Sequence, residues 1–97
     1  LPMHLSETDY RYIRLARFAA DTGTSFADAI RLAKLAAVRN NAEATAISVD
    51  DGGKARKRAD AALKRFEKFA AECGFGVMWP GLWPVLTRGG KQIDLPG

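Results

Sequence analysis

The chain has 97 residues, 47% of them hydrophobic and 27% charged. This length supports one modest core, and the apolar content is too high for a disordered segment, so a single domain over residues 1–97 is predicted. No apolar run reaches the ~18 residues of a membrane span, so we expect no membrane partner. One cysteine, Cys73, excludes an internal disulfide. Because no export leader opens the chain, we expect a cytoplasmic protein.

The net charge of +4 is concentrated in the second half of the chain. Residues 1–53 carry six Arg and Lys against seven Asp and Glu, whereas residues 54–97 carry nine against four. This asymmetry favours an anionic partner for the second half.

Residues 6–21 are predicted to form the first helix. Ser6 is a good N-cap, and Gly23 is a typical stop. At 100° per residue, one face is largely apolar and is expected to enter the core. That face comprises Tyr12, Ile13, Leu15, Ala16, Ala19 and Ala20. The opposite face mixes arginines with aromatic residues, which are Tyr10, Arg11, Arg14, Arg17 and Phe18.

Two further helices are predicted at residues 25–39 and 54–73. Both keep an i, i+3, i+4 apolar rhythm, and Gly74 is placed to end the second of them. Residues 42–49 are ambiguous, because their alternation suits a short strand while the preceding helix could also continue.

After Gly74 the sequence turns to glycine, proline, aromatic and β-branched residues. Turn signals at Pro80-Gly81 and Gly89-Gly90 predict three short antiparallel strands, at residues 75–79, 82–87 and 91–95. The fold class is therefore α+β: three amphipathic helices followed by a small C-terminal three-stranded antiparallel β-meander.

Two-residue turns would pair Phe75 with Leu86 and Leu86 with Ile93. Because side chains alternate along a strand, one face would then be apolar and lie on the helices. That face comprises Phe75, Val77, Trp79, Leu82, Pro84, Leu86, Ile93 and Leu95. Trp83 would point outward beside Met78 and Val85. Pro84 counts against this register, because proline cannot donate to a central ladder.

The sequence holds no catalytic motif and no cluster of cysteines and histidines, so we expect no enzymatic activity, no metal and no cofactor. His4 and Cys73 lie far apart in the chain. Asp50 and Asp51 adjoin two glycines, which is more typical of a polar loop with a helix cap than of a cation site.

Residues 16–35 can also be aligned with a helix-turn-helix, with Gly23 in the turn. The second helix would offer Arg31 and Lys34 to DNA, but also Asp28. An ordinary helical hairpin explains the same residues.

The strongest charge feature is the third helix, whose Lys and Arg residues could follow phosphates. The residues expected to bind nucleic acid are Lys54, Lys57, Lys64, Arg65 and Lys68. We therefore predict a small, basic, non-enzymatic binding module, associated with DNA or RNA. The alternative is a protein-interaction or inhibitor domain, or a homodimer. The residues expected at such an interface are Tyr10, Arg11, Arg14, Arg17, Phe18, Met78 and Trp83.

Overall fold

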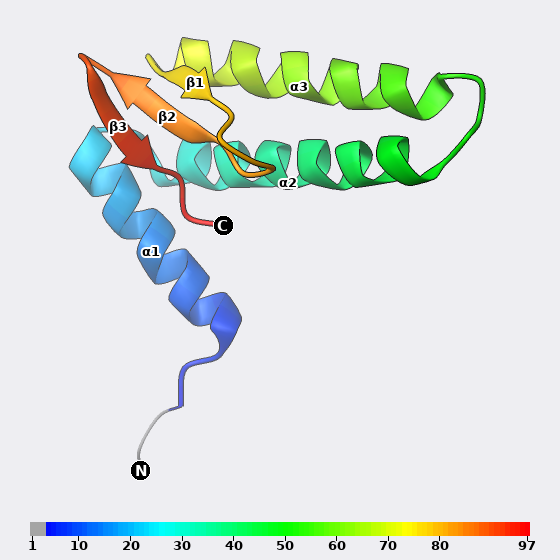
Figure 1. Ribbon diagram of the computed structural model, residues 1–97. Helices are drawn as coiled ribbons and strands as arrows, with labels where there is room; N and C mark the ends of the chain where they lie inside the picture. The colour runs from blue at the N-terminus through cyan, green and yellow to red at the C-terminus, as the bar shows by residue number, and fades with distance from the viewer. Residues whose placement is uncertain (1–3) are drawn as a thin grey trace.

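A computed structural model describes residues 4–97 of the chain (Figure 1). The helices are α1 (Glu7–Thr22), α2 (Phe26–Ser48) and α3 (Lys54–Glu72). The strands are β1 (Gly76–Met78), β2 (Val85–Arg88) and β3 (Lys91–Asp94), which form one antiparallel sheet in the order β1-β2-β3. The predicted α+β class, with three helices before a three-stranded meander, is confirmed.

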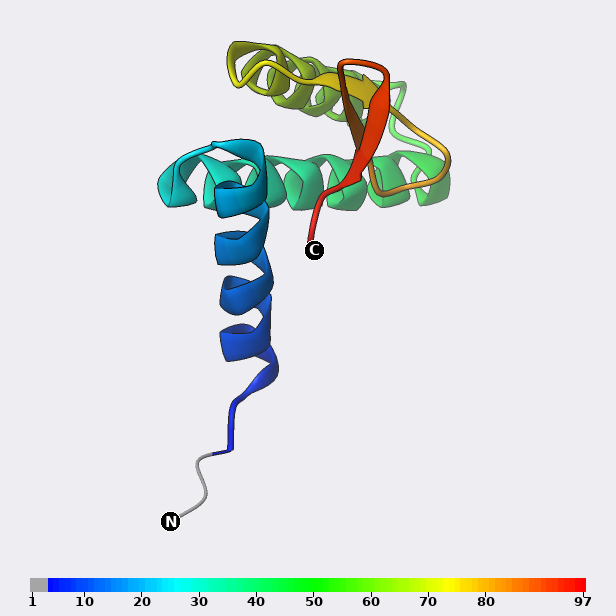
Figure 2. The ribbon, with the colours of Figure 1, turned by 90° about the vertical axis from the view of Figure 1, so that its left-hand side faces the viewer.

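The α2 and α3 helices run antiparallel, and the sheet covers one face of this hairpin (Figures 1 and 2). The α1 helix crosses the start of α2, and its N-terminal half extends away from the rest of the molecule (Figure 2). The C-terminal half of α1 therefore contributes to the core, while its first turns have few neighbours.

Local capping explains where each helix begins. Ser6 accepts a hydrogen bond from the Asp9 amide, and the Asp9 carboxylate accepts one from the Ser6 amide, which forms a capping box. These bonds from the Ser6 backbone and hydroxyl lower the pKa of Asp9. Ser25 caps α2 by accepting a hydrogen bond from the Asp28 amide at 3.1 Å. The N-cap of α3 is Gly53, and the carboxylate of Asp51 accepts from the Ala55 amide in the first turn at 3.0 Å.

The second helix is longer than predicted, because α2 continues through the ambiguous residues 42–49 to Ser48. Alanine is the strongest helix former, and it recurs at every second position from Ala42 to Ala46. Glu43 also pairs with Arg39 one turn earlier, with 3.7 Å between the charged atoms. Local propensity and side-chain pairing therefore outweigh the strand-like alternation.

The predicted inward face of α1 is confirmed for Leu15 and Ala19, which are buried, and is wrong for its other members. Ile13 is 52% exposed and Ala16 and Ala20 are also exposed, whereas Phe18 is only 5% exposed. The Phe18 ring lies 5.9 Å from the Phe75 ring, centroid to centroid. Burying one phenylalanine removes more apolar surface from water than burying two alanines, so the helix is rotated to turn Phe18 inward.

The sheet register differs from the predicted one by two residues at the first turn. Leu86 was predicted to pair with Phe75, but it pairs with Val77. The predicted pair of Leu86 and Ile93 is confirmed. Residues 79–84 form an open loop in place of a two-residue turn, so that Pro84 lies outside the ladder. A shift of two residues preserves the face of each side chain that stays in the ladder, which is why Leu86 is still buried, whereas Leu82, predicted on the same face, lies in the loop and is exposed.

One core joins the helices and the sheet. Phe66 of α3 and Leu32 of α2 are fully buried beneath Leu86 of β2. Most of the buried residues of the two long helices are alanines, which allow close approach. The buried alanines are Ala29, Ala36, Ala55, Ala59, Ala62 and Ala70.

Candidate functional site

A row of exposed basic side chains follows the outer surface of α3, and we call it the α3 basic face. Neighbouring members along the face are three, four or seven residues apart, so they share one side of the helix. Ala61 lies at its centre, and the buried stripe of Ala59, Phe66 and Ala70 turns the opposite side of α3 toward the core. The α3 basic face consists of Lys54, Lys57, Lys64, Arg65 and Lys68, all of which are exposed.

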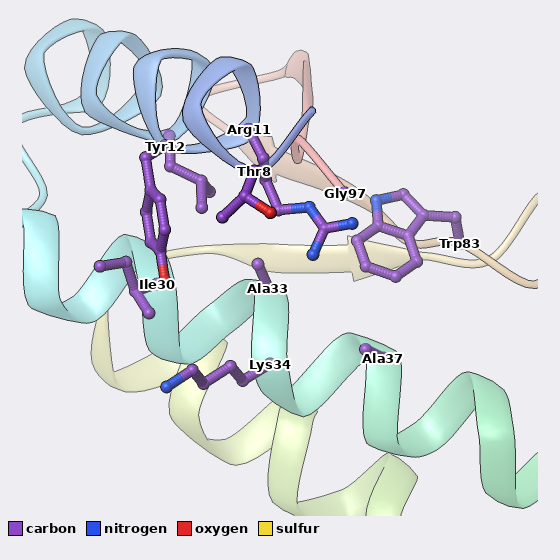
Figure 3. Close-up of a pocket in the computed structure, with 10 residues that line it drawn as sticks. Thr8, Arg11, Tyr12, Ile30, Ala33, Lys34, Ala37, Trp83 and Gly97 are labelled. Atoms are coloured by element: carbon purple, nitrogen blue, oxygen red, sulfur yellow. The ribbon is translucent and has the colours of Figure 1, made fainter. Parts of the chain in front are cut away.

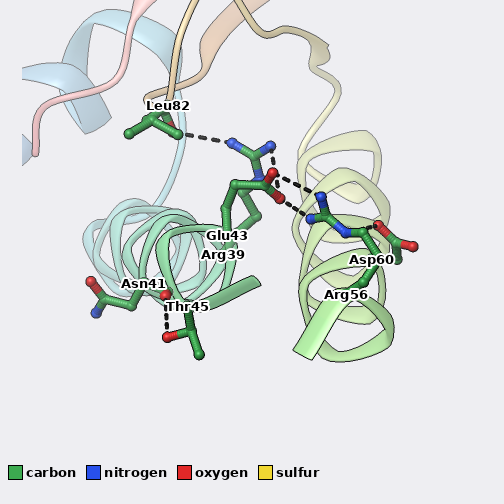
Figure 4. Close-up of polar contacts among 7 residues, drawn as sticks. All are labelled: Arg39, Asn41, Glu43, Thr45, Arg56, Asp60 and Leu82. Atoms are coloured by element: carbon green, nitrogen blue, oxygen red, sulfur yellow. Dashed lines mark hydrogen bonds and ion pairs between the residues drawn. The ribbon is translucent and has the colours of Figure 1, made fainter. Parts of the chain in front are cut away.

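Ion pairs separate these five residues from the other two basic residues of α3. Arg56 binds the Glu43 carboxylate, with one hydrogen bond of 2.9 Å, and lies 3.5 Å from Asp60 (Figure 4). Arg58 lies 3.4 Å from Asp51. Among residues 4–97, none of the five side chains of the α3 basic face forms an ion pair. Their charges are therefore available to an external anion.

The Arg56–Glu43 pair links α3 to α2. The hydrogen bond from Arg56 is the main reason that the pKa of Glu43 is lowered, with smaller contributions from the charges of Arg56 and Arg39. This pair joins Arg39, Glu43, Arg56 and Asp60 into a row of alternating charges (Figure 4). We interpret this row of charges as a contact that holds α2 and α3 together, and not as a ligand site.

A shallow groove between α2 and α3 extends the basic surface. Its volume is about 210 Å³, and Arg65 and Lys68 line it. Arg31 of α2 lies on the same groove, with its guanidinium carbon 4.3 Å from the centre of the Phe69 ring. Glu72 is the one acidic residue among those lining the groove. Sequence reasoning did not connect Arg31 with α3, because the two are brought together only by the packing of the helices.

The loop that contains both tryptophans is part of the structure of the domain. Trp79 packs against Phe66, with ring centroids 5.5 Å apart. Trp83 is half-buried and donates a hydrogen bond from Nε1 to the Leu95 carbonyl at 2.7 Å. The prediction that Trp83 points outward beside Met78 is therefore wrong. Trp83 precedes β2, so the alternation of the strand does not control its direction.

Trp83 instead lines a cleft between α1 and α2 (Figure 3). The cleft has a volume of about 260 Å³, below the roughly 300–1,000 Å³ of most ligand pockets. Its walls are mainly apolar, with Arg11 and Lys34 also contributing (Figure 3). The residues that line it are Thr8, Arg11, Tyr12, Leu15, Ile30, Ala33, Lys34, Ala37, Trp83 and Gly97.

The residues expected to form one interface on α1 are divided by the structure. Phe18 is in the core, and Arg11 lines the cleft with Trp83. Tyr10, Arg14 and Arg17 are exposed. Met78 is exposed on the sheet, away from the buried Leu86 face. Of the predicted interface, Tyr10, Arg14 and Arg17 therefore remain exposed on α1 outside this cleft. Ile13, which was predicted to be buried, is exposed as well.

The remaining reactive groups are not brought together. Cys73 is half-buried, and burial raises the pKa of its thiol, which disfavours the nucleophilic thiolate. Among residues 4–97, no group of three or more His, Cys, Asp or Glu side chains is arranged to hold a metal ion. Arg31, which the helix-turn-helix alternative offered to DNA together with Lys34, lies over the Phe69 ring at the groove with Arg65 and Lys68, and not at the Lys34 cleft.

No protein-family model, curated protein or solved structure matches the chain. Within the described part of the chain, every helix is too short or too polar to span a bilayer. A functional assignment therefore depends on the surfaces described above.

Proposed function

We propose that the protein is a small binding module that holds the phosphate backbone of nucleic acid on the α3 basic face. The observation that supports this proposal is the difference between paired and unpaired cations on α3. Arg56 and Arg58 are bound by acidic residues of the same chain, whereas the five side chains of the α3 basic face have no such partner within residues 4–97.

The dimensions of the surface suit a backbone rather than a single anion. Lys54 and Lys68 are fourteen residues apart, which corresponds to about 21 Å along a helix. A row of this length can contact several phosphates and release their counterions, which is the main source of sequence-independent affinity. Four of the five cations are lysines, which act as mobile point charges and read no particular base.

The groove beside the α3 basic face adds two arginines with the geometry to bind a single phosphate group. Arg31 and Arg65 present planar guanidinium groups, which can bind a phosphate through two parallel hydrogen bonds. We propose that this groove holds one phosphate while the lysines follow its neighbours. Glu72 lies at the same groove and would oppose a second anion there.

The test compares two triple variants with the same loss of charge. Lys57, Lys64 and Lys68 changed to Gln should weaken binding to labelled DNA and RNA and lower the salt slope by about 2–2.7 in log-log terms. Changing Arg11, Arg14 and Lys91 to Gln removes the same charge elsewhere, and should lower affinity much less. Fluorescence anisotropy over a salt series measures both effects, and circular dichroism checks that each variant is folded.

Three results would contradict the proposal. The first is no binding by the parent protein at about 50 mM salt, where electrostatic affinity is high. The second is an equal loss of affinity in both triple variants, which would indicate a response to net charge alone. Binding to anionic lipid vesicles with no binding to DNA or RNA would also contradict it.

A protein-interaction module is the second candidate. The observation that favours it is the apolar surface at the start of α1, where Leu5 before the helix and Tyr10 and Ile13 on it are each more than 40% exposed. Contiguous exposed apolar side chains on a small protein are typical of a partner surface. Binding that persists at high salt would favour this candidate over the first.

A further inference from the structure

The outer side of α1 carries a stripe of residues with the spacing of a helix-pairing seam. Ser6, Tyr10, Ile13, Arg17 and Ala20 follow one another at alternating intervals of four and three residues. This is the spacing at which side chains meet a second helix in a coiled coil. All five are exposed, and Ile13 at the centre of the stripe is 52% exposed.

The position of α1 leaves this stripe accessible. The N-terminal half of the helix extends beyond the α2–α3 hairpin and the sheet (Figure 2). Only the opposite side of α1, with Leu15, Phe18 and Ala19, is buried in the core. The Tyr10 and Ile13 part of the stripe is therefore open to a second helix, while Arg17 also borders a hollow shared with Asp94 and Pro96.

The charges on either side of Ile13 are complementary between two antiparallel copies of α1. Asp9 lies four residues before Ile13, and Arg17 lies four residues after it. In an antiparallel pair of α1 helices centred on Ile13, Asp9 of each copy therefore lies opposite Arg17 of the other. The same alignment places the Tyr10 ring next to that arginine, where cations are favoured over an aromatic face.

The groups involved are free to make these contacts. Both hydrogen bonds from Ser6 to Asp9 end on Oδ2, and Oδ1 accepts none within the described residues. Arg17 forms no ion pair among residues 4–97. The capping box also fixes the Asp9 side chain, so less conformational entropy is lost when it binds.

We propose that two copies of the chain form a symmetric dimer through antiparallel α1 helices, with Ile13 against Ile13 and Asp9 against Arg17 at both ends. A two-fold axis through Ile13 makes the interface closed, so association stops at two. The contact is small, one helix against one helix, so the dimer is weak. The second copy of the chain therefore covers the exposed apolar surface of α1 described above. This dimer does not depend on nucleic-acid binding.

The test uses two charge reversals, Arg17→Asp and Asp9→Arg. Each variant alone places like charges opposite each other twice in a homodimer, and its self-association should weaken by about tenfold or more. When the two variants are mixed, both contacts become Asp against Arg again, and a heterodimer should form. Sedimentation velocity without nucleic acid, from about 10 to about 1,000 µM protein, measures each case.

A matched pair of apolar substitutions separates this surface from a general effect of charge. Ile13→Lys should abolish self-association, whereas Val38→Lys should leave it unchanged, because Val38 is 50% exposed but lies on α2. Circular dichroism confirms that the helices are retained, in particular in Asp9→Arg, which loses half of its capping box.

Three results would overturn the proposed dimer. A parent protein that stays monomeric over the whole concentration range overturns it. A dimer that survives Ile13→Lys shows that another surface is responsible and also overturns it. Failure of the mixed charge variants to associate, while the parent dimerises, rejects the antiparallel alignment with Asp9 opposite Arg17.

Discussion

The guanidinium carbon of Arg39 lies 4.2 Å from the centre of the Trp79 ring. The same guanidinium donates a hydrogen bond to the Leu82 carbonyl at 3.3 Å and lies 3.7 Å from the Glu43 carboxylate (Figure 4). Arg39 therefore connects α2 to two points of the loop between β1 and β2, Trp79 at its start and Leu82 within it. The aromatic ring and the carbonyl of this loop are used to hold the sheet against the helices.

Trp79→Ala should therefore destabilise the domain strongly, by about 3 kcal/mol, because it removes the contacts with both Phe66 and Arg39. The free energy of unfolding from urea titration measures the loss. Leu82→Ala is a matched control in the same loop, since Leu82 is exposed and contributes its backbone carbonyl to Arg39. Equal losses in the two variants would show that Trp79 does not anchor the loop.

Trp83→Phe should cost about 1–2 kcal/mol, because the ring is largely retained while the hydrogen bond to the Leu95 carbonyl is lost. The Leu95 carbonyl would be left without this donor. Urea titration gives the free energy, and hydrogen exchange should show faster opening of β3. A stability unchanged from that of the parent would mean that this hydrogen bond contributes nothing.

Phe18→Ala should destabilise the domain by about 3–4 kcal/mol, whereas Ile13→Ala should change the stability by less than about 0.5 kcal/mol. Phe18 is buried against Phe75, and Ile13 is exposed on the other side of α1. Denaturant titrations at low protein concentration, where copies of the chain are separate, measure the two values. A larger loss of stability in Ile13→Ala than in Phe18→Ala would show that Ile13 faces inward, as predicted from the helical wheel.

Arg88→Lys should destabilise the ends of two helices. The Arg88 guanidinium donates to the carbonyl of Thr22 at the end of α1, at 2.6 Å, and to that of Cys73 after α3, at 2.8 Å. A lysine cannot reproduce this fork of donors, so we expect a loss of about 2 kcal/mol. Amide exchange should rise in the last turn of both α1 and α3, and a uniform change across the chain would contradict this role.

The Glu43–Arg56 pair should make stability depend on acid pH. The pKa of Glu43 is lowered in the folded protein, chiefly by the hydrogen bond from Arg56. Its contribution is therefore present above the unfolded pKa of about 4.3 and is lost as the pH falls through the lower folded value. Glu43→Gln should be less stable than the parent near neutral pH, and this difference should shrink at low pH.

Urea midpoints of the parent and Glu43→Gln across the acid range test this dependence. Glu67→Gln is the control, because Glu67 is exposed and forms no ion pair among residues 4–97. A difference between Glu43→Gln and the parent that stays constant with pH would show that the Glu43 carboxylate is not stabilised by its charge.

Local features of the sequence determined the order of elements and most of their boundaries. Ser6, Ser25 and Gly23 act within one turn of their own position, so capping could be read directly from the residue types. The basic side of α3 followed from spacing alone, because side chains three and four residues apart share a helix face. Alternation along the strands likewise placed Leu86 and Ile93 on the same face.

Tertiary packing decided which side of α1 faces inward, how far the turn before β2 is opened and where Trp83 lies. The helical wheel ranked the faces of α1 by their number of apolar residues, but the single Phe18 ring fills the space beside Phe75. The loop at residues 79–84 is held by Arg39 from a distant part of the chain, and the Trp83 indole by the Leu95 carbonyl. These contacts join residues from about a dozen to more than fifty positions apart, and local preferences carry no information about them because they arise only when the elements pack together.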